Sequence, residues 1–257
     1  ILTNFHANTN FPAEMGRCLG PDFQVANFAT GGYSTHQSLI LYRRLLARKA
    51  PRIAVVCHAF NERSPGIDSD NAMGERNRRA SVRLLHFLSY SKIVQEWRRV
   101  IWHLMGYDPY ADERRVRNVK RRVPIEDFRD NLAAFVRESQ AHNVSLVLVS
   151  QGILTKVIVD DCRPYFAEME RAASTQPGVY YLDVQPQVFQ YYQERLGRVP
   201  EYYPQDGLRY LLLHSDACHL NDDGAKFIGD LTCRFLREKN ENGPQIGEHA
   251  NGVAQLK

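Results

Sequence analysis

Short apolar runs alternate along this chain with longer segments of helical period. Their apolar residues are nearly continuous and often β-branched, which is typical of strands buried on both faces. These runs predict strands over Phe23–Ala29, Ile53–Ala59, Ser145–Ser150 and Val179–Val184. Amphipathic spacing predicts helices over Thr35–Lys49, Pro124–His142 and Arg163–Ser174, and a last helix capped by Asn221. The alternation indicates an α/β fold with a central parallel sheet, helices on both faces and a site at the carboxyl ends of the strands.

The length of 257 residues, of which 44% are hydrophobic, fits a single domain, to which we assign residues 1–238. Pro65–Val123 is too long for an ordinary connection and predicts a helical insertion beside the site. This insertion is either a lid or substrate-binding wall, or a helix that completes the core. Residues 239–257 are polar and predict a disordered tail.

The charge balance and the cysteines exclude several classes of protein. The chain has 33 basic and 29 acidic residues, and a net charge of +4 gives no reason to expect a nucleic-acid partner. The basic run Arg114–Arg122 is interpreted as a solvated face, with contact to phosphate or an anionic polymer as the alternative. No apolar run reaches the roughly 18 residues of a membrane span. Five scattered cysteines indicate neither a disulfide framework nor a zinc site, so we expect no metal and no cofactor.

An Asp-x-x-His step, from Asp216 to His219, precedes the last predicted helix. A carboxylate at this spacing accepts one imidazole N–H while the other ring nitrogen faces a nucleophile. The pair therefore indicates half of a hydrolytic triad. His58 has no carboxylate partner of this kind and is interpreted as a packed or hydrogen-bonding residue.

Two further blocks follow predicted strands. Asn27–Thr35 turns through Gly31 and Gly32 into a helix, and glycine there lets a backbone N–H point into a pocket. Cys57–Arg63 places the side-chain amide of Asn61 just past a buried strand. We expect these blocks and the Asp216–His219 step to meet at one edge of the sheet.

Together the three blocks resemble those of the SGNH, or GDSL-type, esterase and lipase superfamily, over almost the whole chain. The resemblance implies a flavodoxin-like three-layer α/β/α sandwich and an ester hydrolase that works through an acyl-enzyme. By motif position, Gly32 and Asn61 correspond to the family's oxyanion-hole donors, and Asp216 and His219 to its catalytic pair. The third block reads Ala59-Phe60-Asn61-Glu62 where the family usually has Gly-x-Asn-Asp, and it retains the asparagine.

The family's first block, Gly-Asp-Ser, does not occur in the sequence. Thr9–Pro12 resembles the segment that follows that block, so the resemblance places the nucleophilic serine, with the usually central first strand, just upstream of Ile1. We therefore expect the chain to be N-terminally incomplete. Ser34 is the internal alternative, although a helix cap explains a serine there without chemistry.

The leading hypothesis is a serine esterase that hydrolyses an O-acyl ester, O-acetyl among them, of a carbohydrate or small molecule. One alternative is an O-acyltransferase on the same scaffold, in which a sugar hydroxyl replaces water. The other is a catalytically inactive SGNH-like binding domain, which recognises a ligand without turning it over. The sequence makes no prediction of compartment or oligomeric state.

Overall fold

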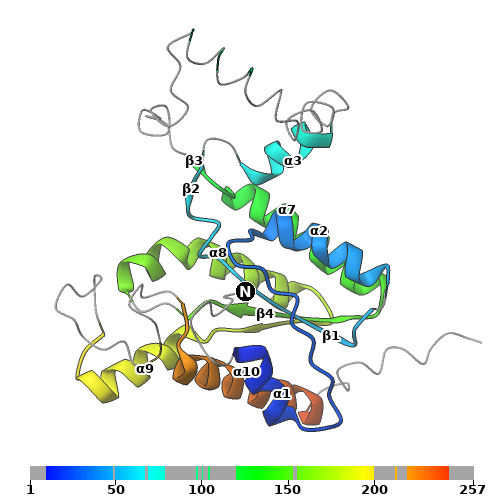
Figure 1. The fold of residues 1–257 in the computed structure, drawn as a ribbon. Coiled ribbons are helices and arrows are strands. Elements are labelled where there is room, and N and C mark those ends of the chain that lie inside the picture. The colour runs from blue at the N-terminus through cyan, green and yellow to red at the C-terminus, as the bar shows by residue number, and fades with distance from the viewer. Residues whose placement is uncertain are drawn as a thin grey trace, which may run out of the picture.

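The fold is seen in a computed structural model (Figure 1). The structure describes residues 10–48, 50–66, 69–78, 97, 100, 104, 120–152, 155–199, 212 and 219–242. These residues form a mixed α/β fold with a three-stranded parallel sheet and helices on both of its faces.

The central sheet consists of three parallel strands in the order β1-β4-β5. Their bounds are Ile53–His58 for β1, Ser145–Ser150 for β4 and Val179–Leu182 for β5. In the register of the sheet, Ile53 lies opposite Ser145 and Leu146 lies opposite Val179. Every residue of β4 is buried, as expected for a strand that has neighbours on both edges and helices on both faces. Three of the four predicted strands are therefore confirmed.

The fourth predicted strand, Phe23–Ala29, is wrong. This segment forms no regular element, and Phe28 is 53% exposed. Its composition is that of a strand, but a strand also needs a hydrogen-bonding neighbour. Within the described part of the chain, β1 is an edge strand and no other strand pairs with its outer edge.

Two sets of helices cover the two faces of the sheet (Figure 1). One face packs against three helices: α2 (Thr35–Leu46), α7 (Ile125–Ala141) and α8 (Lys156–Thr175). The other face packs against α1 (Phe11–Leu19), α9 (Gln185–Leu196) and α10 (Asp222–Asn242). Alternation along β1 sends Val56 to the first set and Cys57 to the second.

The predicted helices are confirmed, with differences at their ends. α2 and α7 begin and end close to the predicted residues. α10 begins where predicted, and the Asn221 side chain accepts a hydrogen bond from the Gly224 N–H at 2.9 Å as the predicted cap. α8 begins earlier than predicted, at Lys156, so Asp160 and Asp161 lie inside the helix rather than at its start. The sequence analysis missed α1 and α9, which are short and each have a proline in the first turn.

A disulfide between Cys18 and Cys233 joins α1 to α10, which corrects the expectation that the cysteines form none. The two residues are separated by 215 positions, so the spacing of cysteines along the sequence does not predict the bond. The helices also approach closely at Gly229, where a Cβ atom would lie 2.6 Å from the Cβ of Glu14. The disulfide therefore joins two helices that are already in close contact, with Gly229 of α10 against Glu14 of α1.

The predicted insertion starts and ends in a short antiparallel pair. β2 (Pro65–Gly66) pairs with β3 (Lys120–Arg121), and α3 (Asp70–Arg78) follows β2 (Figure 1). Three apolar side chains farther along the insertion are exposed, namely those of Trp97, Val100 and Leu104. Most of the insertion lies outside the described residues, so its role as a lid or wall stays a prediction.

At the C-terminus, α10 continues to Asn242, past the predicted end of the domain at residue 238. The predicted disordered tail, 239–257, is therefore wrong for residues 239–242, which belong to α10. Residues 243–257 lie outside the described part of the chain, and the single-domain division stays a prediction. None of the described helices is long and apolar enough to cross a membrane.

Candidate functional site

Gly32 lies in a tight turn directly before α2. The turn is closed by a hydrogen bond from the Tyr33 N–H to the Thr30 carbonyl at 3.3 Å. Gly32 has φ of +75°, in the left-handed region where glycine carries no Cβ penalty. Ser34 is the N-cap of α2 and directly precedes its first residue, Thr35. The local sequence thus forms a tight turn that leads into α2, and Gly32 lies in this turn.

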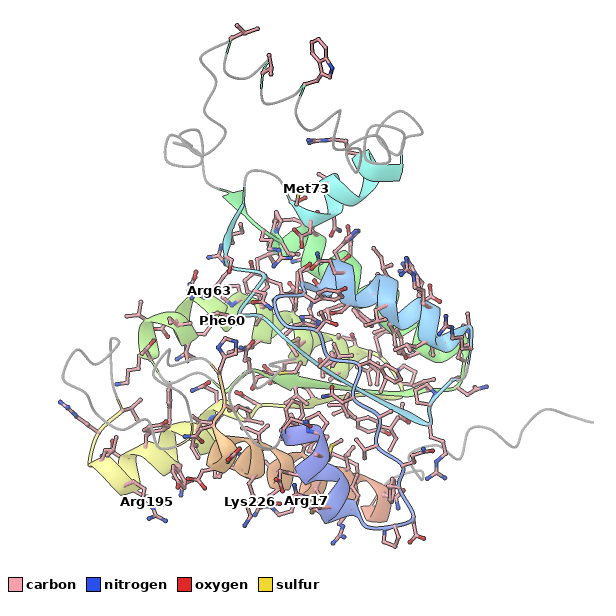
Figure 2. The ribbon with its side chains drawn as sticks, in the orientation of Figure 1. Arg17, Phe60, Arg63, Met73, Arg195 and Lys226 are labelled. Carbon is pink, nitrogen blue, oxygen red and sulfur yellow. A yellow bond between two sulfur atoms is a disulfide. The ribbon has the colours of Figure 1, made fainter. Side chains whose placement is uncertain are left out.

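Asn61 reaches this turn from the loop after β1. Its Nδ2 donates a hydrogen bond to the Tyr33 carbonyl at 2.9 Å. The structure therefore brings together the segments of the two predicted oxyanion-hole residues, Gly32 and Asn61. An amide nitrogen carries two hydrogens, and among the described residues only the Tyr33 carbonyl accepts from Asn61. Nearby on the same loop, the Arg63 guanidinium lies 4.6 Å from the centre of the Phe60 ring (Figure 2).

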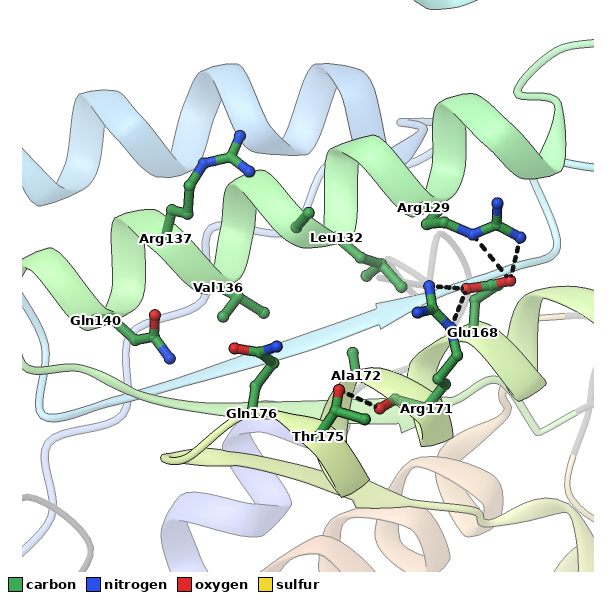
Figure 3. A pocket seen from close by; sticks show the side chains of 11 residues that line it. Arg129, Leu132, Val136, Arg137, Gln140, Glu168, Arg171, Ala172, Thr175 and Gln176 are labelled. Atoms are coloured by element: carbon green, nitrogen blue, oxygen red, sulfur yellow. Dashed lines mark hydrogen bonds and ion pairs between the residues drawn. The ribbon is translucent and has the colours of Figure 1, made fainter.

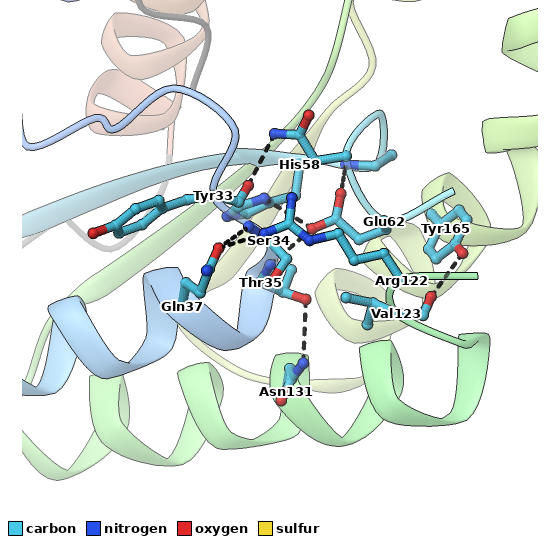
Figure 4. Close-up of polar contacts among 12 residues, drawn as sticks. Tyr33, Ser34, Thr35, Gln37, His58, Glu62, Arg122, Val123, Asn131 and Tyr165 are labelled. Atoms are coloured by element: carbon cyan, nitrogen blue, oxygen red, sulfur yellow. Dashed lines mark hydrogen bonds and ion pairs between the residues drawn. The ribbon is translucent and has the colours of Figure 1, made fainter. Parts of the chain in front are cut away.

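A buried carboxylate, that of Glu62, ties the loop after β1 to the start of α2 (Figure 4). One oxygen accepts from the Ala59 N–H at 2.9 Å, and the other accepts from the Thr35 N–H at 2.8 Å. The second oxygen also lies 3.1 Å from Nδ1 of His58, whose side chain is only 3% exposed. The expectation that His58 is a packed, hydrogen-bonding residue is confirmed, but it does have a carboxylate partner, four residues further on. Asn61 is held between these two anchored segments.

Burial and the hydrogen bonds of the site together shift the pKa values of His58 and Glu62. Desolvation lowers the pKa of the His58 imidazole, so the ring is neutral at pH 7 and donates from Nδ1. Desolvation alone would raise the pKa of Glu62, but His58 and the backbone N–H donors outweigh it and hold that pKa below its usual value. Glu62 is therefore an ionised acceptor, which is the state that these donors require.

Ala59, between His58 and Glu62 on this loop, has an unusual backbone. Its φ is +127°, a region that side chains with a Cβ rarely adopt, and its side chain is fully buried. The loop keeps this conformation because the Glu62 carboxylate accepts the Ala59 N–H. Backbone strain of this kind often accompanies functional sites.

Arg122 also contacts the glycine turn, close to Ser34 and Gln37 (Figure 4). Its Nη1 donates to the Gly32 carbonyl at 2.6 Å and its Nη2 donates to Oε1 of Gln37 at 2.8 Å. Its Nε donates to the Asp70 carboxylate at 2.9 Å. The neighbouring Arg121 pairs with Asp161 at 2.6 Å. The interpretation of Arg114–Arg122 as a solvated face is therefore wrong for Arg122, whereas the Arg121 side chain is 39% exposed. Residues 114–119 lie outside the described part of the chain.

Three candidates near this edge, Ser34, Cys57 and Cys162, do not have the surroundings of a nucleophile. Ser34 is the N-cap of α2, which confirms the predicted cap. Its side chain is fully buried and its Oγ donates to Asp70 at 2.5 Å, which argues against Ser34 as the nucleophile. The thiols of Cys57 and Cys162 are buried too. Burial raises the pKa of both, that of Cys162 to about 12, so neither forms a thiolate near pH 7.

His219 lies just before α10. The next residue, Leu220, is buried in the same apolar cluster as Cys57, which immediately precedes His58 in β1. Ile228 of α10 packs beside Gly152, just past the end of β4, because a Cβ there would lie 3.4 Å from it. These contacts place the start of α10 against the carboxyl half of the sheet. Asp216 lies outside the described residues, so the Asp216–His219 pair and its approach to Asn61 stay predictions.

A separate cavity of about 210 Å³ lies between α7 and α8 (Figure 3). Its polar lining includes Arg129 and Arg171, which both pair with Glu168. Gln140 and Gln176 line it near the ends of α7 and α8, which lead into the amino ends of β4 and β5. The cavity therefore extends away from the carboxyl ends of the strands and does not include Gly32 or Asn61.

Sequence reasoning missed Glu62, Asp70 and Arg122. Glu62 carries a weak signal, because it occupies the acidic position of the third block, four residues after His58. Asp70 and Arg122 carry none, since 52 positions separate them. In the part of the chain that the structure describes, no group of three or more His, Cys, Asp or Glu side chains is placed to hold a metal ion.

Comparisons with known proteins give no relative. The chain matches no family model, and neither curated proteins nor solved structures yield a similar protein. The class of this protein is therefore defined by its own residues: an α/β fold whose glycine turn and asparagine amide meet past the carboxyl end of β1.

Proposed function

We propose that this chain belongs to a serine esterase of the SGNH type, with a flavodoxin-like α/β/α sandwich, that hydrolyses an O-acyl ester of a carbohydrate or small molecule. The observation that carries the proposal is the hydrogen bond from Asn61 to the carbonyl next to Gly32. It places two potential donors, the Gly32 N–H and the second Asn61 N–H, on adjoining anchored segments. Donors fixed before the reaction are what stabilises a tetrahedral oxyanion.

The third block supports the proposal in spite of its departures from the family pattern. Ala59 stands where the family usually has glycine, and its φ of +127° is a conformation that glycine adopts readily. Glu62 stands where the family usually has aspartate, and it accepts two backbone N–H groups and His58. Both replacements are thus compatible with the backbone that holds Asn61.

In this mechanism His219 removes the proton from the attacking serine hydroxyl, and Asp216 fixes the imidazole tautomer and stabilises the imidazolium. Gly32 and Asn61 hold the oxyanion, which collapses as the ester C–O bond breaks and the alcohol leaves with the proton from His219. His219 then deprotonates a water that attacks the acyl-enzyme, which releases the acid and returns the proton to the serine. The proposed nucleophile is a serine N-terminal to Ile1, at the end of a strand that pairs with the outer edge of β1. Among the described residues no strand pairs with the outer edge of β1, and this supports the placement, because an unpaired strand edge leaves backbone groups without partners.

The test is labelling of the protein, with its natural N-terminal sequence, by a fluorophosphonate, followed by intact and peptide mass spectrometry. We expect one adduct, on a serine N-terminal to Ile1, that disappears in His219→Ala. The matched control is His142→Ala, which removes an exposed histidine at the end of α7 and should leave labelling unchanged. An unlabelled protein, or labelling that survives His219→Ala, contradicts the proposal and favours a binding domain. Products formed with and without a sugar acceptor separate hydrolysis from acyl transfer.

A further inference from the structure

The two ends of the insertion meet at the glycine turn. The Arg122 backbone N–H donates to the Ser64 carbonyl at 2.7 Å, and the Asp70 N–H donates to the Arg122 carbonyl at 2.9 Å. Asp70 is the first residue of α3, and Arg122 directly follows β3. The base of the insertion is therefore closed by backbone hydrogen bonds on either side of Arg122.

One buried carboxylate, that of Asp70, links this base to α2. Only 4% of its side chain is exposed, and it accepts from both Arg122 Nε and Ser34 Oγ. A charge-assisted bond of this kind is stronger than a neutral one, and it orients the guanidinium plane. With Nε held by Asp70, the two terminal nitrogens of Arg122 point at the Gly32 carbonyl and at Gln37 (Figure 4).

Two successive carbonyls of the turn are thus held by side chains from different segments. Arg122 holds the Gly32 carbonyl and Asn61 holds the Tyr33 carbonyl. Two consecutive glycines, Gly31 and Gly32, give this turn unusual backbone freedom, so it needs such anchors to keep one conformation. An oxyanion donor on a turn that samples several conformations loses its advantage, because its reorganisation is then part of the barrier.

α3 also packs directly on the start of α2. A Cβ at Gly74 would overlap the His36 ring, so the two helices touch there. The Asn71 and Asn131 side chains exchange hydrogen bonds at 3.2 and 3.1 Å, which joins α3 to α7 as well. The base of the insertion is therefore a fixed part of the structure around the turn.

We propose that Arg122 is a positioning residue: held by Asp70 at the base of the insertion, its guanidinium fixes the Gly32 turn in the conformation that donates to the oxyanion. This inference rests on the proposed esterase function. Arg122 acts through the Gly32 carbonyl, which lies in the peptide group after the one that carries the Gly32 N–H, and makes no contact with the reacting atoms in this scheme. The base of the insertion therefore affects catalysis through Arg122, and this role does not require the rest of the insertion to cover the site.

The test compares Arg122→Ala with the matched control Arg121→Ala, which removes the adjacent arginine and its pair with Asp161. With p-nitrophenyl acetate, we expect Arg122→Ala to lower kcat roughly 100-fold with a smaller change in KM, as for a misplaced catalytic donor. Arg121→Ala should stay within about threefold of the wild type, because exposed ion pairs contribute little. Added methylguanidinium should restore part of the kcat of Arg122→Ala and should not affect Arg121→Ala.

Two further measurements keep the inference falsifiable. Arg122→Lys keeps a cation for Asp70 but cannot bridge Gly32 and Gln37 at once, so we expect a folded protein with roughly tenfold lower kcat. Amide exchange across residues 30–34 should be faster in Arg122→Ala than in Arg121→Ala. An active wild type whose kcat and exchange are unchanged in Arg122→Ala overturns the positioning role alone. A wild type without ester turnover or fluorophosphonate labelling overturns the proposed function instead.

Discussion

The two faces of the sheet are held by different means. The face covered by α2, α7 and α8 contains a buried polar network around Glu62 and Asp70, next to its apolar core. The face covered by α1, α9 and α10 relies on a second apolar cluster and on the Cys18–Cys233 disulfide. A fold of this size does not need buried carboxylates for stability, since apolar packing serves as well or better.

This difference indicates separate roles for the two faces. The buried carboxylates connect the β1 loop, the start of α2 and the base of the insertion, and all three segments border Gly32 and Asn61. The opposite face fixes α10 and, through Leu220, the residue next to His219. We therefore expect changes on the first face to affect turnover strongly, and changes on the second to affect mainly stability.

The largest effect on stability is expected from Glu62→Gln. A glutamine amide cannot accept from Ala59, Thr35 and His58 together, and it brings N–H groups against N–H donors. Breaking a buried charged network in this way costs about 3–5 kcal/mol of unfolding free energy. Ester turnover should fall as well, because Asn61 is the preceding residue.

The control for Glu62→Gln is Asp160→Asn. Asp160 pairs with Arg163 on the surface of α8, where both side chains are more than half exposed. Such pairs contribute between 0 and about 1 kcal/mol. Equal losses for the two variants in denaturant unfolding would show that the buried network is no more important than a surface ion pair.

The double variant Cys18→Ser/Cys233→Ser tests the expected role of the opposite face of the sheet. Removal of a native disulfide typically costs about 2–5 kcal/mol, and long loops lie toward the upper end in chain-entropy models. We expect a loss of this size in urea unfolding without reductant, with kcat unchanged for the folded fraction. Unaltered stability, or a fall in kcat as large as that of Asn61→Ala, would contradict the separation of roles.

A smaller effect is expected from pH. Because burial depresses the pKa of His58, its contribution to stability is present above its unfolded value of 6.5 and is lost as the pH falls below it. Glu62 acts in the same direction below its unfolded value of 4.5. Unfolding free energy should therefore fall from pH 7 to pH 5, by up to about 1.4 kcal/mol per pH unit for each proton taken up.

His58→Asn tests the assignment of this slope, since its Nδ2 can take the place of Nδ1 as donor to Glu62 without titrating. Urea midpoints measured between pH 5 and 7 should vary less with pH in this variant than in the wild type. An identical slope in both proteins would mean that His58 is not the group responsible.

The parts of the fold that the sequence predicted are those that local pattern determines. β1, β4 and β5 are short apolar runs bounded by helices, and their burial requires that composition. The sequence places Gly32 and Asn61 together because each follows a predicted strand. The hydrogen bond to Tyr33 joins their segments, although the segment before Gly32 does not form the predicted strand. The one wrong strand, Phe23–Ala29, has the composition but no described neighbour.

The parts that the sequence did not predict depend on distant partners. Cys18 and Cys233 are 215 positions apart, and nothing in their surroundings marks them as a pair. Asp70 and Arg122 stand at opposite ends of the insertion and meet only because β2 and β3 pair. Arg122 lay in a basic run whose ordinary interpretation is a solvated face. Periodicity and motif spacing describe residues that are close in sequence, whereas these contacts join residues that are far apart in sequence.

The most direct test of the central claim is ester turnover by Asn61→Ala, measured beside its unfolding free energy. We expect kcat to fall about 100- to 1000-fold, as for the loss of one oxyanion donor. Stability should change by no more than about 1.5 kcal/mol, the net value of the hydrogen bond to Tyr33. Asn61→Asp, of the same size but without the N–H donor, should lose at least as much activity. Unchanged ester turnover in both variants of an active protein would contradict the account.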